Sequence, residues 1–108
     1  MMQKFKKYLV DIDTSIDALY LHTKDMNFDD FSKNLTVKRA VEREFEIIGE
    51  AVNRIIKEEP DFKISNARKI VDLRNYIIHG YDAVDYETLW AVLKRHIPVL
   101  KNEINQYL

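Results

Sequence analysis

The sequence predicts an all-α protein, an up-down bundle of four to five helices in a single domain that spans residues 1–108. Only two glycines and two prolines occur in the chain, which favours long helices over a turn-rich β fold. Apolar residues recur at steps of three and four along most of the chain, which is the period of an amphipathic helix. A chain of 108 residues fits one domain with one modest core, to which a second copy would add buried surface.

The first two long helices are predicted from their apolar stripes. A helix is expected over 3–22, with a stripe of Phe5, Tyr8, Leu9, Ile12, Ile16, Leu19 and Tyr20. The stretch 24–34, KDMNFDDFSKN, breaks this pattern and is expected to be a loop with one short turn around 28–31. A second helix is expected over 36–58, because Pro60 blocks its continuation. Its stripe is Val37, Val41, Phe45, Ile48, Val52 and Ile55.

A second, polar stripe follows the same helix at steps of four, three, four and four. It consists of Arg39, Arg43, Glu46, Glu50 and Arg54. One interpretation is a solvated face laced with ion pairs. The other is a polar wall that lines a site.

The third helix is predicted to run from an N-cap at Ser65 to about His79. Gly80 stands where the C-terminal cap of a helix favours glycine.

A fourth helix is predicted to start at the N-cap Asp85, with Glu87 in its first turn to suit the macrodipole. Pro98 lies inside this helix and should kink it near Lys94 because proline removes one hydrogen bond. The apolar stripe is Leu89, Trp90, Leu93, Ile97, Leu100 and Ile104.

Composition excludes several classes of protein. The net charge is −1 and the pI about 6.3, so any contact with nucleic acid would use a local cluster of Lys and Arg. The chain has no cysteine, which excludes disulfides, thiolate catalysis and Cys-ligated metals. The N-terminus lacks the apolar run of a signal peptide, and no stretch is long enough to span a bilayer. We therefore expect a cytoplasmic protein.

Common catalytic motifs are absent as well. The three histidines are His22, His79 and His96; they fall on three different helices without HExxH spacing, so we expect no metal site. The two glycines, Gly49 and Gly80, cannot form a phosphate-binding loop.

One stretch, RNYIIHGY (74–81), crowds polar groups around a helix end. Arg74 and His79 point about 140° apart on an ideal helix, whereas Asn75 and His79 share a face. With Tyr81 they converge only if the helix end bends or a second chain supplies part of the set. Such a set could cleave RNA without metal, with histidine as the base and arginine on the phosphate. The alternative is structural: a glycine cap, a histidine on the helix dipole and a surface ion pair.

The spacing of Arg74, His79 and Tyr81 gives RxxxxHxY, which resembles the signature of HEPN-domain ribonucleases. The stretch KRAVEREFEIIGEAVNRI (38–55) looks like the second helix of the HepT toxin branch of that family. The order that follows also fits: a proline break, a helix ending in RNYIIHGY, and a last helix with ETLW and HIPVL. The resemblance covers essentially the whole chain.

This resemblance implies the toxin of a toxin–antitoxin pair, a cofactor-free homodimer whose two motifs face each other in an interface cleft. It implies an RNA substrate, tRNA or mRNA. Arg74 would bind the scissile phosphate, His79 would be general base or acid, and Asn75 would orient them. Tyr81 would assist, and would be the residue that an antitoxin nucleotidyltransferase of the MntA type adenylylates.

Two further expectations concern the polar stripe. Glu46 and Glu50 could hold Arg74, and the three stripe arginines could supply local positive charge. Two other functions stay open. One is a non-catalytic HEPN module that binds a nucleotide or a partner beside a nucleotidyltransferase, and the other is a structural dimer without a site.

Overall fold

The computed structural model describes residues 2–80 and 85–108, with the side chains of 2–4 left aside. The helices are α1 (Met2–His22), α2 (Phe28–Ser32), α3 (Leu35–Glu58), α4 (Ala67–His79), α5 (Tyr86–Arg95) and α6 (Ile97–Asn105). Within the described ranges there is no strand, so the prediction of an all-α fold is confirmed. His96 alone separates α5 from α6, so these two take the place of the single last helix, and the described residues form five helical units.

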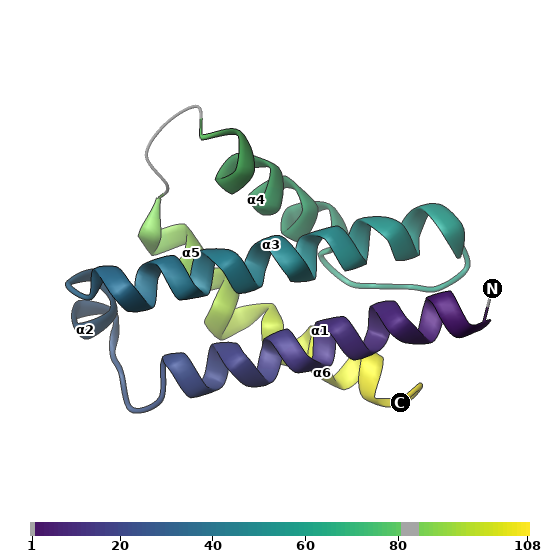
Figure 1. Cartoon of the computed structure of the whole chain (residues 1–108), viewed down its shortest axis with the longest axis horizontal. Helices are drawn as coiled ribbons and strands as arrows, with labels where there is room; N and C mark the ends of the chain where they lie inside the picture. Colours follow the sequence, from purple (N-terminus) through teal and green to yellow (C-terminus); the bar gives the residue numbers. More distant parts are fainter. Residues whose placement is uncertain (1, 81–84) are drawn as a thin grey trace.

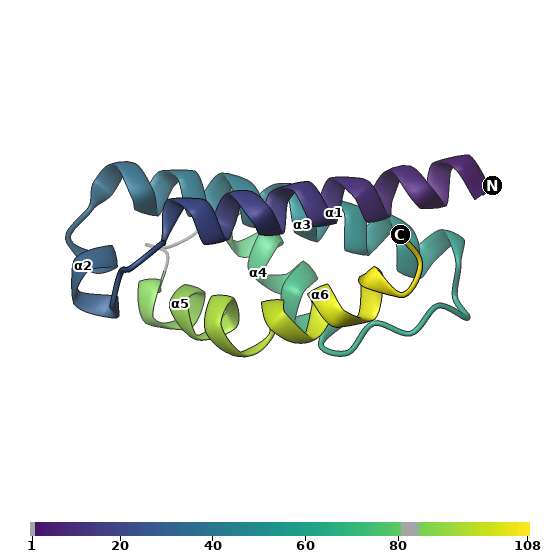
Figure 2. The ribbon, with the colours of Figure 1, turned by 90° about the horizontal axis from the view of Figure 1, so that it is seen from below.

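The long helices α1 and α3 run antiparallel, side by side (Figure 1). Helix α4 packs against α3 on the side away from α1. Helices α5 and α6 form a second layer across this group (Figure 2). Helix α3 is therefore the central element, which contacts both α1 and α4.

The predicted apolar stripes form the core. Side chains from α1, α3, α5 and α6 are fully buried, among them Leu9, Ile16, Phe45, Ile55, Leu93 and Leu100. The short helix α2 adds Phe31, which is 0% exposed and packs on Trp90 with ring centroids 5.0 Å apart. Helix α2 begins with a capping box between Asn27 and Asp30, so the expected turn is a short helix. Through Phe31 it packs against Trp90 of α5.

The start of α4 differs from the prediction. The residue at the N-cap is Asn66, in the left-handed conformation with φ 63° and no side-chain cap hydrogen bond. Ser65 instead donates its hydroxyl to Glu103 of α6 at 2.8 Å, and its backbone N–H donates to the same carboxylate. A partner far away in sequence thus outcompetes the local cap. The end of α4 is as predicted: Gly80 has φ 58°, and its N–H donates to the carbonyl of Tyr76.

The last predicted helix is broken rather than kinked. Asp85 is the N-cap of α5, as expected. The helix then ends at Arg95 instead of bending near Lys94, and Pro98 lies in the first turn of α6. A proline costs little there, because the first N–H groups of a helix have no partner within the helix. None of the described helices is both long and apolar enough to cross a membrane.

Candidate active site

Arg74 lies at a close approach of α4 to α3. The crossing point on α3 is Gly49, whose backbone lies directly against the base of the Arg74 side chain. A Cβ built on Gly49 would overlap the Cβ of Arg74 and lie 2.7 Å from its Cγ. Only a glycine leaves room for this approach. The close crossing holds Arg74 half-buried, with 23% of its side chain exposed.

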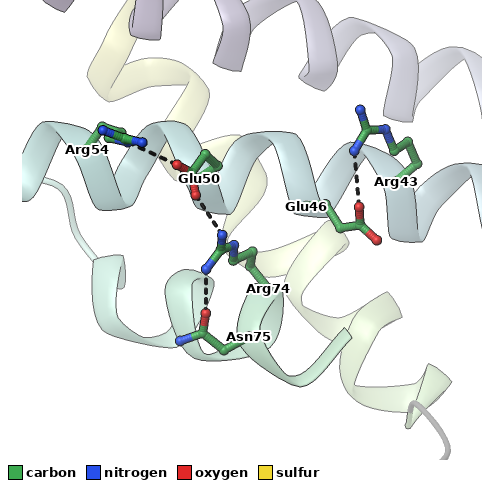
Figure 3. Close-up of polar contacts among 6 residues, drawn as sticks. All are labelled: Arg43, Glu46, Glu50, Arg54, Arg74 and Asn75. Carbon is green, nitrogen blue, oxygen red and sulfur yellow. Dashed lines mark hydrogen bonds and ion pairs between the residues drawn. The ribbon is translucent and has the colours of Figure 1, made fainter. Parts of the chain in front are cut away.

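Two polar groups hold the Arg74 guanidinium, and Arg54 of α3 joins the same network through one of them (Figure 3). Its Nη2 donates to Oε2 of Glu50 at 2.7 Å, and its Nη1 donates to Oδ1 of Asn75 at 2.7 Å. Its Nε is buried and has no hydrogen-bond partner among the described residues. The second oxygen of Glu50 accepts from Nε of Arg54 at 2.9 Å. The orientation of Arg74 is thus fixed by one carboxylate and one amide.

The polar stripe offered two glutamates, Glu46 and Glu50, that were expected to hold Arg74. Glu50 holds Arg74, as expected, whereas Glu46 pairs with Arg43 of its own helix at 3.1 Å. Asn75 orients Arg74 directly, one residue away.

An open groove of about 690 Å³ runs beside Arg74 between α1, α3 and the end of α4. Its lining residues are Lys7, Tyr8, Asp11, Arg43, Glu46, Ile47, Glu50, Ala51, Arg54, Arg74 and Ile78. Four of them are cationic and three are anionic, which leaves the groove one positive charge in excess although the chain has a net charge of −1. Four of the five stripe residues, Arg43, Glu46, Glu50 and Arg54, form ion pairs and line this groove, whereas Arg39 is not among its lining residues.

Helix α1 supplies the opposite wall. Lys7 and Asp11 form an ion pair of 3.0 Å. The hydroxyl of Tyr8 donates to Glu58 at 2.9 Å, and this hydrogen bond, with burial, raises the pKa of Tyr8 above its ordinary value. Sequence patterns gave no sign of this wall, since it depends on how α1 packs on α3.

His79, the second residue of the motif, is the last residue of α4. His79 is exposed in the last turn and, unlike Ile78, is not among the described residues that line the groove. Tyr81 lies outside the described residues. One chain thus brings Arg74, Asn75 and Glu50 together. The convergence of Arg74 with His79 in a two-chain cleft stays a prediction.

The remaining histidines lie elsewhere. His22 ends α1 and lies 3.8 Å from Glu44, and His96 joins α5 to α6. Within the described ranges, no three side chains of metal-binding type gather at one place.

Comparisons with known proteins point to one family. The sequence model described as "Ribonuclease HepT-like" matches residues 12–107. The "Probable ribonuclease HepT" of Thermococcus cleftensis is 34% identical over 110 residues, which cover 98% of this chain and 97% of the relative. The "Putative RNase MJ0125" of Methanocaldococcus jannaschii is 36% identical over 104 residues, or 95% and 90% of the two chains. No solved structure matches the chain.

Proposed function

Because this chain belongs to the HepT-like ribonuclease family, we propose that it is a metal-independent endoribonuclease and the toxin of a toxin–antitoxin pair. The observation that carries the proposal is the Arg74 guanidinium, which Glu50 and Asn75 hold in one orientation beside a slightly cationic groove.

Arg74 would bind the scissile phosphate. Its Nη1 and Nη2 each make one hydrogen bond within the protein and each carry a second hydrogen for a phosphate oxygen. A guanidinium fork matches two such oxygens. Since the side chain is already oriented and half-buried, it can stabilise the charge of the transition state without reorganising.

His79 would move the proton. A histidine imidazole can act as a general base and take the proton of the ribose 2′-hydroxyl. The 2′-oxygen then attacks the neighbouring phosphorus, the bond from phosphorus to the 5′-oxygen breaks, and the leaving oxygen takes up a proton. In a homodimer the second His79 would act as that acid, so two facing motifs would supply both proton transfers.

The antitoxin would act on the same place. A nucleotidyltransferase of the MntA type would transfer AMP from ATP to the hydroxyl of Tyr81, two residues after His79, and release pyrophosphate. The adenylyl group adds bulk and a negative phosphodiester close in sequence to His79. It would exclude RNA and repel its phosphates.

Growth arrest on expression tests the function. Wild-type protein should arrest growth, and His79→Ala should not, although the variant keeps its helical content and oligomeric state. Growth arrest by His79→Ala would reject the catalytic role and favour a non-catalytic binding module. For the antitoxin step, intact mass after co-expression with the nucleotidyltransferase should show one added adenylyl group, which Tyr81→Phe abolishes.

A further inference from the structure

The carboxylate of Glu50 bridges two arginines from different helices (Figure 3). Its Oε2 accepts from Arg74 on α4 at 2.7 Å, and its Oε1 accepts from Arg54 on α3 at 2.9 Å. All three side chains line the same groove. Arg54 is therefore coupled to Arg74 through Glu50.

A carboxylate beside a phosphate-binding arginine opposes the binding of the phosphate. Arg74 and Glu50 alone would form a neutral pair, and an RNA phosphate bound to Arg74 would lie close to the negative charge of Glu50. Arg54 adds one positive charge on the other oxygen of that carboxylate, so the two arginines and one glutamate carry a net charge of +1. This group attracts a phosphate where the isolated pair would not.

The exposure of the two arginines suggests different tasks. Arg74 is 23% exposed and donates to both Glu50 and Asn75, so its guanidinium is held in place. Arg54 is 57% exposed and donates to the other oxygen of Glu50.

We propose that Arg54 is a positioning residue of the ribonuclease site, which holds the carboxylate of Glu50 and offsets its negative charge when an RNA phosphate binds to Arg74. Glu50 orients Arg74 in the free protein. When the phosphate arrives, Glu50 keeps its charge-assisted hydrogen bond to Arg54 and is not left unpaired. This inference rests on the proposed function, because it assumes that Arg74 binds RNA phosphate.

Arg43 provides a matched control on the same helix. It lines the same groove and carries the same charge, and its side chain is 68% exposed. Its ion pair, however, is with Glu46. Arg43→Gln therefore removes one positive charge from the groove and leaves the carboxylate between Arg54 and Arg74 untouched.

The test is steady-state cleavage of a labelled single-stranded RNA by the full chain in EDTA. Arg54→Gln should raise KM about tenfold with little change in kcat. A change of that size lies within the range that coupling between charged side chains in contact produces. Arg54→Lys should keep most of the wild-type KM because it retains the charge. Arg43→Gln should raise KM by less than Arg54→Gln does, because it removes one positive charge from the groove but leaves the carboxylate of Glu50 paired.

A double-mutant cycle tests the route through Glu50. Once Glu50→Gln has removed the carboxylate, Arg54→Gln should have little further effect on KM. A full tenfold increase in that background would overturn the proposal, and so would equal increases in Arg54→Gln and Arg43→Gln. RNA affinity is measured in parallel in a His79→Ala background, where cleavage does not interfere.

The two failures can be told apart. If the wild-type chain neither cleaves nor binds RNA, the proposed function is wrong and the role of Arg54 is wrong with it. If the wild-type chain cleaves RNA but Arg54→Gln behaves like Arg43→Gln, only the role of Arg54 is rejected.

Discussion

Replacement of Gly49 by alanine would place a methyl group where α4 crosses α3. The new Cβ would overlap the Cβ of Arg74 and lie 2.7 Å from its Cγ. Carbon atoms in contact are about 3.5–4.0 Å apart, so α4 or the base of Arg74 must move by about 1 Å. The overlap involves the stem of the side chain rather than its flexible end, so rotation of the guanidinium cannot relieve it.

Two opposing contributions set the expected stability of Gly49→Ala. Alanine is favoured over glycine inside a helix by about 1 kcal/mol, and overpacking costs about 1–3 kcal/mol. The free energy of unfolding should therefore fall by about 0–2 kcal/mol. The rate of RNA cleavage should fall by about 100-fold, because a shift of about 1 Å in the position of Arg74 can cost that much.

The assay combines urea unfolding with kcat/KM for RNA cleavage. Ala40→Gly is the matched control: by helix propensity it costs about 1 kcal/mol, at a half-buried position of α3 about 13 Å along the helix from Gly49. It should lose stability and keep its activity. Wild-type activity in Gly49→Ala, together with a gain in stability, would refute the claim that the close approach of α4 to α3 positions Arg74.

Three further predictions concern the fold. Ser65→Ala removes the hydroxyl hydrogen bond to Glu103 and should lower the free energy of unfolding by about 0.5–1.5 kcal/mol without affecting cleavage; an unchanged urea midpoint would contradict this. Phe31→Ala empties a fully buried position and should cost about 3–5 kcal/mol by the same measurement. Hydrogen bonds from Thr88 hold the pKa of Asp85 below its ordinary value of 3.8. The stability that the Asp85 carboxylate adds is therefore fully present above that value and is lost as pH falls through the lowered pKa. The urea midpoints of wild type and Asp85→Ala should therefore differ at neutral pH and converge in acid.

Local patterns predicted most of the fold. The apolar stripes identified the long helices, and Gly80 and Asp85 marked two helix ends correctly. The prediction for Ser65 failed because its partner, Glu103, is brought to it only by the folded chain. The sequence predicted a kink where the structure has a break at His96. Pro98 shows in the sequence that one hydrogen bond is lost, but not that a new helix starts beside it.

The site was predictable in part. The motif singled out Arg74 and Asn75, and the polar stripe suggested the carboxylate of Glu50. The role of Gly49 was missed, although an isolated glycine in a strong helical pattern is a signal of close packing. The contribution of α1 to the groove could not be read from the sequence, because it arises from the contact between two helices.

The most direct test of the account is the rate at which the purified full chain cleaves a defined RNA in the presence of EDTA. The wild-type chain should cleave, and His79→Ala and Arg74→Lys should each lose about 100-fold or more of the rate while they keep the fold. Arg68→Lys, at an exposed arginine of the same helix that pairs with Asp72, should cleave like the wild type. A wild-type rate in His79→Ala would contradict the account.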